Sequence, residues 1–120
     1  MTDELYERAV AVAERAYAPY SEYLVGAVVL ARDGRVFEGV NVENAAYPLG
    51  ICAEKSAIAQ AVTAGCKPGD LEAIGITASP CGGCRQWIYE FRFDRVTFRN
   101  AQGEVVTRTP AELLPETFEL

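Results

Sequence analysis

The hydrophobic positions of this chain repeat with two different periods, and each change of period marks an expected element. Near the N-terminus they recur every three to four residues, which predicts an amphipathic helix from Thr2 to about Tyr17 with Thr2 or Asp3 as its N-cap. Pro19 ends this helix because proline cannot continue the backbone hydrogen bonds of a helix. Two apolar runs then flank Asp33-Gly34, which is a hairpin signal. Both runs are predicted strands, Val25–Ala31 and Arg35–Val40.

The rest of the chain alternates helical and strand patterns around one irregular stretch. Residues 41–51 carry Asn, Pro and Gly without periodicity, so they predict a loop. Strong helix formers predict a helix over Ala53–Ala64, with Gly65 as its stop. The remaining predicted elements are a strand at Leu71–Thr77, a helix that begins at Ser79-Pro80 and continues through Cys84–Phe91, strands at Arg95–Arg99 and Glu104–Arg108, and a short capped helix at Thr109–Leu114. This order predicts a single domain, residues 1–120, in which helices cover the faces of one sheet in a three-layer α/β fold.

Composition removes several functional classes. The chain has no histidine, which excludes Ser-His-Asp and Cys-His catalysis and leaves carboxylates, thiols, lysine and tyrosine for proton transfer. Its net charge of −6 opposes the binding of phosphate backbones, so no nucleic-acid partner is expected. The sequence has neither a basic signal-peptide start nor an apolar run of membrane-spanning length, so we expect a cytoplasmic protein without a membrane partner.

Candidate metal ligands come from two short segments. Cys81 and Cys84 form a Cys-x-x-Cys pair whose Gly82-Gly83 turn lets both sulfurs reach one tetrahedral ion. Cys52 lies 29 residues before Cys81, a separation that is typical of a third ligand on another helix of the same domain. Three protein ligands leave the fourth position of zinc open for water, as in catalytic sites. Glu54 follows Cys52 by two residues and is therefore a candidate to move protons.

A Cys-x-x-Cys pair on its own has two other common explanations. One is a redox dithiol, but this pair does not follow the first strand of a thioredoxin-like βαβ unit. The other is a structural zinc site, which needs a fourth ligand. The only spare cysteine is Cys66, and a helix with a rise of about 1.5 Å per residue places it roughly 20 Å from Cys52. We therefore interpret Cys66 as an ordinary thiol.

Three segments carry a resemblance to a known family: Gly39–Tyr47, Gly50–Glu54 and Pro80–Cys84. They resemble the ribose-binding and zinc-binding segments of the small homotetrameric zinc-dependent cytidine deaminases, and the similarity runs from about Tyr17 to Phe118. The resemblance implies a three-layer α-β-α sandwich with a mixed five-stranded sheet and helices on both faces. It also implies hydrolytic deamination of cytidine and 2'-deoxycytidine to uridine and 2'-deoxyuridine plus ammonia, a pyrimidine-salvage reaction. One zinc ion per subunit and a homotetramer with sites at its subunit interfaces are implied as well.

The resemblance assigns roles around the metal. Cys52, Cys81 and Cys84 are the expected zinc ligands, and Glu54 is the expected catalytic group that moves the proton of water to the base. Lys55 directly follows Glu54, at a position where the family commonly has an Arg that binds the zinc thiolates. A compact ammonium cannot reproduce the bidentate contact of a guanidinium, so we expect the charge of the zinc site to be balanced differently here.

The resemblance also assigns the residues that contact substrate, which are Asn41, Glu43, Tyr23, Ala53, Tyr47 and Phe118. Asn41 and Glu43 suit a neutral sugar because an amide and a carboxylate together read hydroxyl groups without needing charge on them. Tyr47 and Phe118 are expected to reach the site of a neighbouring subunit. The chain between Thr77 and Pro80 is shorter than is usual in the family, which is expected to alter the pocket rim or a subunit contact.

Other functions fit parts of the pattern. Deamination of a cytosine nucleoside analogue such as blasticidin S would use the same zinc chemistry, although Asn41 and Glu43 favour plain ribose. A non-catalytic zinc module that serves assembly would need the sulfurs but not Glu54. A nucleic-acid editor is the weakest alternative because of the negative net charge.

Overall fold

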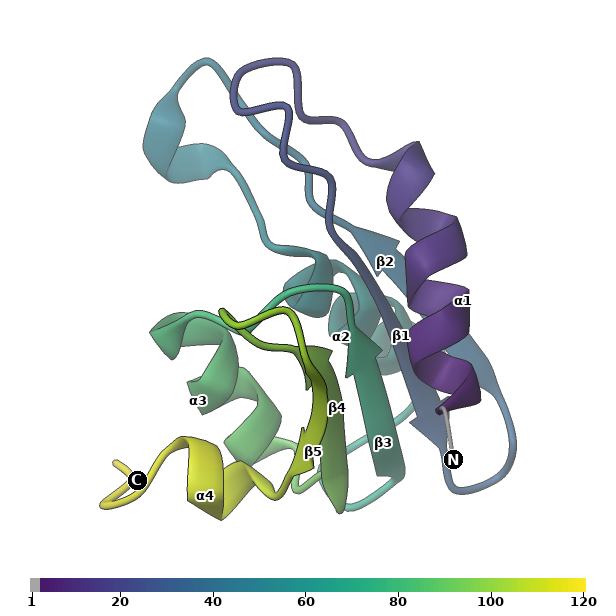
Figure 1. The fold of residues 1–120 in the computed structure, drawn as a ribbon. Helices are drawn as coiled ribbons and strands as arrows, with labels where there is room; N and C mark the ends of the chain where they lie inside the picture. Colours follow the sequence, from purple (N-terminus) through teal and green to yellow (C-terminus); the bar gives the residue numbers. More distant parts are fainter. Residues whose placement is uncertain (1–2) are drawn as a thin grey trace.

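A mixed sheet with helices on both faces organises the chain, as expected (Figure 1). The computed structural model describes residues 3–120. Its elements in chain order are α1 (Glu4–Val12), the 3₁₀ turn η1 (Ala13–Arg15), β1 (Gly26–Ala31), β2 (Val36–Val40), the 3₁₀ turn η2 (Tyr47–Leu49), α2 (Ala53–Thr63), β3 (Leu71–Ile76), α3 (Gly82–Glu90), β4 (Arg95–Arg99), β5 (Val105–Arg108) and α4 (Pro110–Leu113). The five strands lie in the order β2-β1-β3-β4-β5. Only β3 and β4 pair in parallel, and α3 connects them; the other neighbouring strands are antiparallel.

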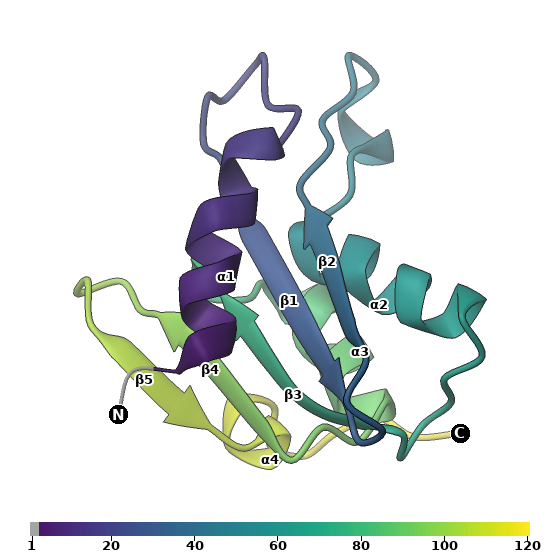
Figure 2. The same ribbon diagram turned by 90° about the vertical axis from the view of Figure 1, so that its right-hand side faces the viewer.

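The two faces of the sheet bury different helices. Helix α1 packs across β1 and β3 on one face, whereas α2 and α3 lie on the other (Figure 2). Alternate residues of β1 follow this division: Val28 faces the α1 cluster, and Ala27 and Val29 face the α2 cluster. The sheet therefore forms the middle layer of a three-layer sandwich, which confirms the predicted fold class.

Helix α1 is shorter than its sequence pattern predicts. The α-helix ends at Val12 and the following 3₁₀ turn ends at Arg15, so the predicted helical end near Tyr17 is wrong. Tyr17 instead forms an isolated bridge with Val42: its amide donates to Asn41 O at 3.1 Å, and its carbonyl accepts from Glu43 N at 2.8 Å. Pairing with the 41–43 segment stabilises an extended backbone that competes with a last helical turn.

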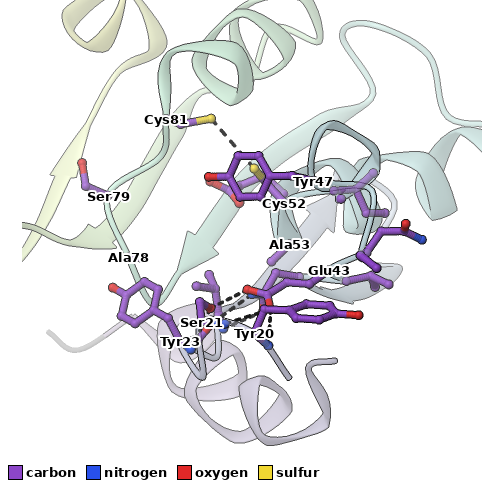
Figure 3. A pocket seen from close by; sticks show the side chains of 18 residues that line it. Tyr20, Ser21, Tyr23, Glu43, Tyr47, Cys52, Ala53, Ala78, Ser79 and Cys81 are labelled. Atoms are coloured by element: carbon purple, nitrogen blue, oxygen red, sulfur yellow. Dashed lines mark hydrogen bonds between the residues drawn. The ribbon is translucent and has the colours of Figure 1, made fainter. Parts of the chain in front are cut away.

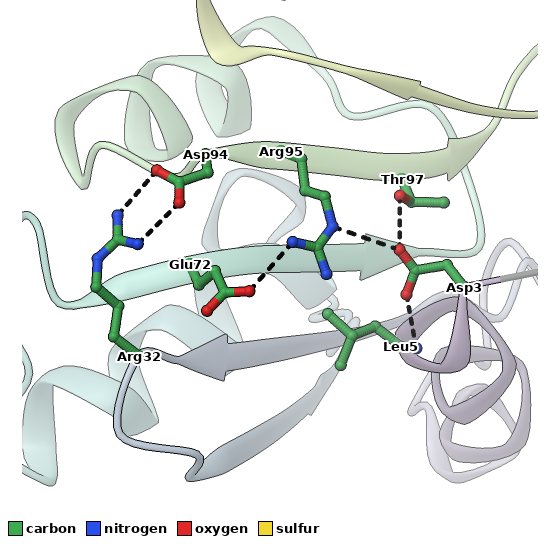
Figure 4. Close-up of polar contacts among 7 residues, drawn as sticks. All are labelled: Asp3, Leu5, Arg32, Glu72, Asp94, Arg95 and Thr97. Atoms are coloured by element: carbon green, nitrogen blue, oxygen red, sulfur yellow. Dashed lines mark hydrogen bonds and ion pairs between the residues drawn. The ribbon is translucent and has the colours of Figure 1, made fainter. Parts of the chain in front are cut away.

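Asp3 is the N-cap of α1 and also ties the helix to the sheet (Figure 4). Its carboxylate accepts from Leu5 N at 2.8 Å and from Thr97 Oγ1 in β4 at 2.9 Å. Arg95 continues the contact toward β3, with 3.9 Å to Asp3 and 3.2 Å to Glu72. These contacts fix the position of α1 on β3 and β4. Thr2, the other expected N-cap, lies outside the described residues.

The other predicted elements are confirmed with boundaries that differ by at most one residue, except at the start of α3. This helix begins at Gly82 with Cys81 as N-cap, and not at Ser79-Pro80. The capping box of α4 is present, with reciprocal bonds between Thr109 and Glu112. Among residues 3–120, no helix combines the length and the apolar character needed to cross a bilayer.

Two close backbone approaches set the position of α2 on the sheet. A side chain at Gly39 in β2 would place its Cβ 2.3 Å from Ala57 N and 2.7 Å from Ala53 O. Glycine is therefore required for α2 to lie this close to β2. Because α2 begins directly after Cys52, this contact also positions the first candidate metal ligand.

Candidate active site

Three cysteine sulfurs from two helix starts meet at one edge of the sheet. Cys52 is the N-cap of α2, Cys81 is the N-cap of α3, and Cys84 lies in the first turn of α3. The Sγ atoms of Cys52 and Cys81 are 3.9 Å apart, and all three Sγ atoms lie within 4.8 Å of one another. Strand β3 leads toward Cys81, and strand β2 leads into Asn41, which lines the same pocket as Cys52 and Cys81.

The donor set and its spacing fit a zinc ion. A tetrahedral zinc with Zn–S bonds of about 2.3 Å places its sulfurs about 3.8 Å apart, close to the distance between Cys52 and Cys81. Thiolates are ligands that zinc binds well, and three of them leave one tetrahedral position for water. Cys66 is buried away from this cluster, with its Sγ 3.5 Å from Arg35 Nη2, as expected for an ordinary thiol.

Electrostatic effects favour negative charge on the Cys52 sulfur and a proton on the Cys84 sulfur. A hydrogen bond from Cys84 lowers the pKa of Cys52 to about 6, and the Lys55 ammonium acts in the same direction. The same hydrogen bond raises the pKa of Cys84, because it stabilises the protonated thiol that donates it. The N-termini of α2 and α3 add partial positive charge beside the sulfurs.

Glu54 lies beside the sulfurs and is almost fully shielded from water, with 4% of its surface exposed. Burial raises the pKa of its carboxyl group to about 7, and the negative charge of Cys52 acts in the same direction. Among residues 3–120, no Lys or Arg nitrogen lies within 4.0 Å of this carboxylate. The carboxyl group is thus free of an ion pair and lines the same pocket as Cys52 and Cys81.

A pocket of about 740 Å³ opens above this cluster. Its size lies within the range of about 300–1,000 Å³ that is typical of small-molecule sites. Its lining includes Cys52, Ala53, Glu54 and Cys81 and residues of the 20–25, 41–51 and 78–79 segments. Figure 3 shows these side chains around one opening. Most of the substrate-binding residues expected from sequence therefore share a single concave site.

Asn41 and Glu43 both brace the 20–25 loop. The Asn41 side chain donates to Tyr23 O and accepts from Val25 N, each at 2.9 Å. The Glu43 carboxylate accepts from the Ser21 hydroxyl and from the amides of Tyr20 and Ser21 (Figure 3). The hydroxyl bond of Ser21 holds the pKa of Glu43 below its usual value, which keeps the carboxylate ionised.

The expected aromatic contacts do not all lie in this chain's own pocket. Tyr23 lines the pocket, as does Tyr47, whose side chain is 91% exposed. Phe118 lies elsewhere: it is 68% exposed near the end of the chain, and its carbonyl accepts from Gln86 Nε2 on α3 at 3.2 Å. The structure thus brings together every expected site residue except Phe118.

Two residues beside the site were missed by sequence reasoning. Ser21 bonds Glu43, but nothing in its local sequence separates it from an ordinary loop serine. Trp87 lies with its ring 5.8 Å from Lys55 Nζ, although its pattern indicated only an apolar helical residue. Its position three residues after Cys84 was the available signal, because residues three apart share one face of a helix.

Comparison with known proteins decides the family. The chain matches the model of the cytidine and deoxycytidylate deaminase zinc-binding region over residues 1–100. The chain belongs to this family. It is 42% identical to the cytidine deaminase of Sporosarcina psychrophila over 113 residues, which is 88% of this chain and 82% of that protein. It is also 40% identical to the cytidine deaminase of Halalkalibacterium halodurans over 122 residues, covering 95% of this chain and 91% of the relative.

Solved structures of the deaminase family share this fold. A crystal structure of cytidine deaminase from Burkholderia pseudomallei superposes with a TM-score of 0.89 at 43% identity, and the match covers 98% of this chain and 100% of that one. Cytidine deaminase from Mycobacterium tuberculosis superposes with a TM-score of 0.83 at 35% identity, covering 98% and 96% of the two chains. In this deaminase fold, the family's zinc-binding region includes the three-cysteine cluster.

Proposed function

We propose that this deaminase-family protein hydrolyses cytidine and 2'-deoxycytidine to the corresponding uridine nucleosides and ammonia. One observation carries the proposal: three cysteine sulfurs cluster at the edge of a pocket of about 740 Å³, and two of these cysteines, Cys52 and Cys81, line that pocket together with the buried Glu54. Among residues 3–120, the Glu54 carboxylate has no ion pair. A non-catalytic zinc module has no need for a pocket or for a buried carboxylate beside its metal. The relatives from Sporosarcina psychrophila, Halalkalibacterium halodurans and Burkholderia pseudomallei described above are named cytidine deaminases.

Cys52, Cys81 and Cys84 would hold the zinc ion, which supplies a Lewis acid that activates water when bound. The protein's own residues then handle the protons. Glu54 accepts a proton from the attacking water and donates it to the ring nitrogen next to C4, while the water oxygen bonds to C4. Glu54 then moves the remaining proton of that oxygen to the amino group, so the C4–N bond breaks and ammonia leaves. Glu54 suits this role because it lines the pocket and, among residues 3–120, no lysine or arginine nitrogen lies within 4.0 Å of its carboxylate.

The charges of the pocket support a nucleoside over a nucleotide. The family includes proteins that act on deoxycytidylate as well as on cytidine, so the pocket lining is the feature that distinguishes the two substrates. Among the lining residues that the structure describes, the charged side chains are Glu43 and Glu54, and none is a lysine or arginine. A 5'-phosphate would meet a carboxylate and no cation, which is unfavourable. A neutral sugar would be read by hydroxyl contacts with Asn41 and Glu43.

The active assembly is proposed to be a homotetramer in which neighbouring subunits complete each site. Tyr47 and Phe118 support this arrangement, because both rings are largely exposed in the single chain and Phe118 lies outside the chain's own pocket. Exposed aromatic rings of this size are typical of interface residues. Native mass spectrometry would give four chains for the unaltered protein. A monomer with full activity would exclude shared sites.

The test of function is a direct assay on purified protein with its zinc content measured. We expect cytidine absorbance to fall with release of one ammonia per cytidine. The kcat/KM for cytidine should exceed that for deoxycytidylate by at least about 100-fold, because the phosphate gains no favourable contact. Blasticidin S is assayed as the competing substrate, and its kcat/KM is compared with that of cytidine. Zinc-loaded protein that releases no ammonia from cytidine would refute the proposal.

A further inference from the structure

The ammonium of Lys55 is held between two helices by an aromatic ring. Lys55 extends from the first turn of α2, and its Nζ lies 5.8 Å from the centroid of the Trp87 ring on α3. This distance is within the range of about 6 Å in which a cation is attracted to an aromatic face. In the part of the chain that the structure describes, no carboxylate lies within 4.0 Å of Lys55 Nζ. The indole is therefore the group that holds the ammonium in place.

The turn between the two cysteines of α3 leaves room for this ammonium. A Cβ atom on Gly83 would lie 3.9 Å from Lys55 Nζ and 4.0 Å from Cys81 Sγ, so the charge and the sulfur flank the same point of the turn. Gly83 and Trp87 are four residues apart and share one face of α3. The Lys55 ammonium therefore lies over this face of α3, near both Gly83 and the Trp87 indole.

We propose that Trp87 is a positioning residue, whose ring holds the Lys55 ammonium beside the Cys81–Cys84 turn so that the lysine charge stabilises the three metal-binding thiolates. A guanidinium could hold its place by paired hydrogen bonds to the sulfurs, but an ammonium is a point charge on a flexible stem and needs another restraint. Trp87 supplies this restraint. The inference rests on the proposed zinc site, and zinc retention is the property that it concerns.

A double-mutant cycle on zinc release tests the coupling. The unaltered protein, Lys55→Met, Trp87→Leu and the double variant are mixed with excess chromogenic zinc chelator, and the rate of zinc loss is followed. Lys55→Met should release zinc about ten-fold faster, as is typical when a group that supports metal ligands is lost. Trp87→Leu should release it about two- to five-fold faster, the effect expected from one cation–π contact at a partly exposed site. In the Lys55→Met background, Trp87→Leu should have no further effect.

Matched variants separate positioning from packing. Trp87→Phe keeps an aromatic face and should stay within about two-fold of the unaltered rate. Tyr89→Leu removes an aromatic ring from α3 without changing the Lys55 contact, so it should leave the rate of zinc release unchanged. Lys67→Met removes a lysine charge elsewhere in the chain and should also leave this rate unchanged. If Trp87→Leu accelerates release equally in both backgrounds, or in neither, the proposal is overturned. If the unaltered protein retains no zinc, both this inference and the proposed function are overturned.

Fluorescence gives a second readout that does not depend on metal loss or on how the leucine variant folds. Trp87 is the only tryptophan of the chain, so the indole emission of the folded protein reports on this ring alone. Removal of the neighbouring cation in Lys55→Met should change the emission intensity, whereas Lys67→Met should leave it unchanged. Identical emission from Lys55→Met and the unaltered protein would contradict the contact.

Discussion

Replacing Glu54 by glutamine removes one proton-transfer group and changes almost nothing else. Glutamine keeps the size and polarity of the side chain, so the buried site should be filled as before. The three sulfurs are untouched, and the glutamine is not expected to bind the metal. The folded structure and the zinc content should therefore match those of the unaltered protein, while the chemistry loses its acid and base.

The structure places the expected loss near the top of the usual range. General acid–base catalysis contributes about 10²–10⁴ in rate, which corresponds to roughly 3–5 kcal/mol. The upper end applies where no other group can substitute. The chain has no histidine, and the other carboxylate that lines the pocket, Glu43, is bound by Ser21 and the adjacent amides. We expect Glu54→Gln to lower kcat by about 10⁴.

The assay compares kcat for cytidine, zinc per chain by metal analysis, and the melting temperature. Glu90→Gln, which changes an exposed carboxylate at the end of α3, serves as the matched control and should retain full activity. A Glu54→Gln protein with normal zinc and more than about a tenth of the original kcat would show that the carboxylate does not transfer the proton, since its loss should cost at least about 10².

Three further predictions follow from the site and its support. Cys84→Ser should abolish zinc retention on metal analysis, because a serine hydroxyl is a poor zinc ligand; retained zinc would exclude Cys84 as a ligand. Gly39→Ala should lower the melting temperature by roughly 4–12 °C, because the new Cβ would lie 2.3 Å from the α2 backbone and such overpacking costs about 1–3 kcal/mol. Among the described residues, a Cβ added at Gly82 meets no atom outside its own helical turn within 4 Å, so Gly82→Ala should keep the melting temperature of the unaltered protein. Asn41→Ala should raise KM for cytidine about ten-fold in steady-state assays, because two hydrogen bonds to the 20–25 loop are lost; an unchanged KM would exclude this role.

The position of the metal ligands could be read from the sequence because they lie at local features. Cys52 and Cys81 each stand next to a clear helix start, and helix starts are marked by composition and by Pro and Gly. The sequence predicted that these cysteines and Cys84 are ligands of one ion, and their ligand atoms all lie within 4.8 Å of one another. The strands were predictable for the same reason, since each apolar run is bounded by turn residues.

Contacts between distant segments were not predictable in this way. Helix α1 stops early because Tyr17 pairs with Val42, which lies 25 residues later and leaves no mark on the local periodicity. The bracing of the 20–25 loop by Glu43 has the same origin, as does the approach of Trp87 to Lys55. Each of these depends on where a second element lies in space.

By itself, the sequence determined which residue types could do chemistry, which segments would be helix or strand, and how the helix starts would present the three cysteines. Only the tertiary structure decided that Glu54 is buried with no ion pair among the described residues, that it lines a pocket, and that the Trp87 ring lies near the Lys55 ammonium. The physical reason is range. Backbone preferences and capping act over a few residues, whereas burial, electrostatic environment and cavities are properties of elements that pack together from all parts of the chain.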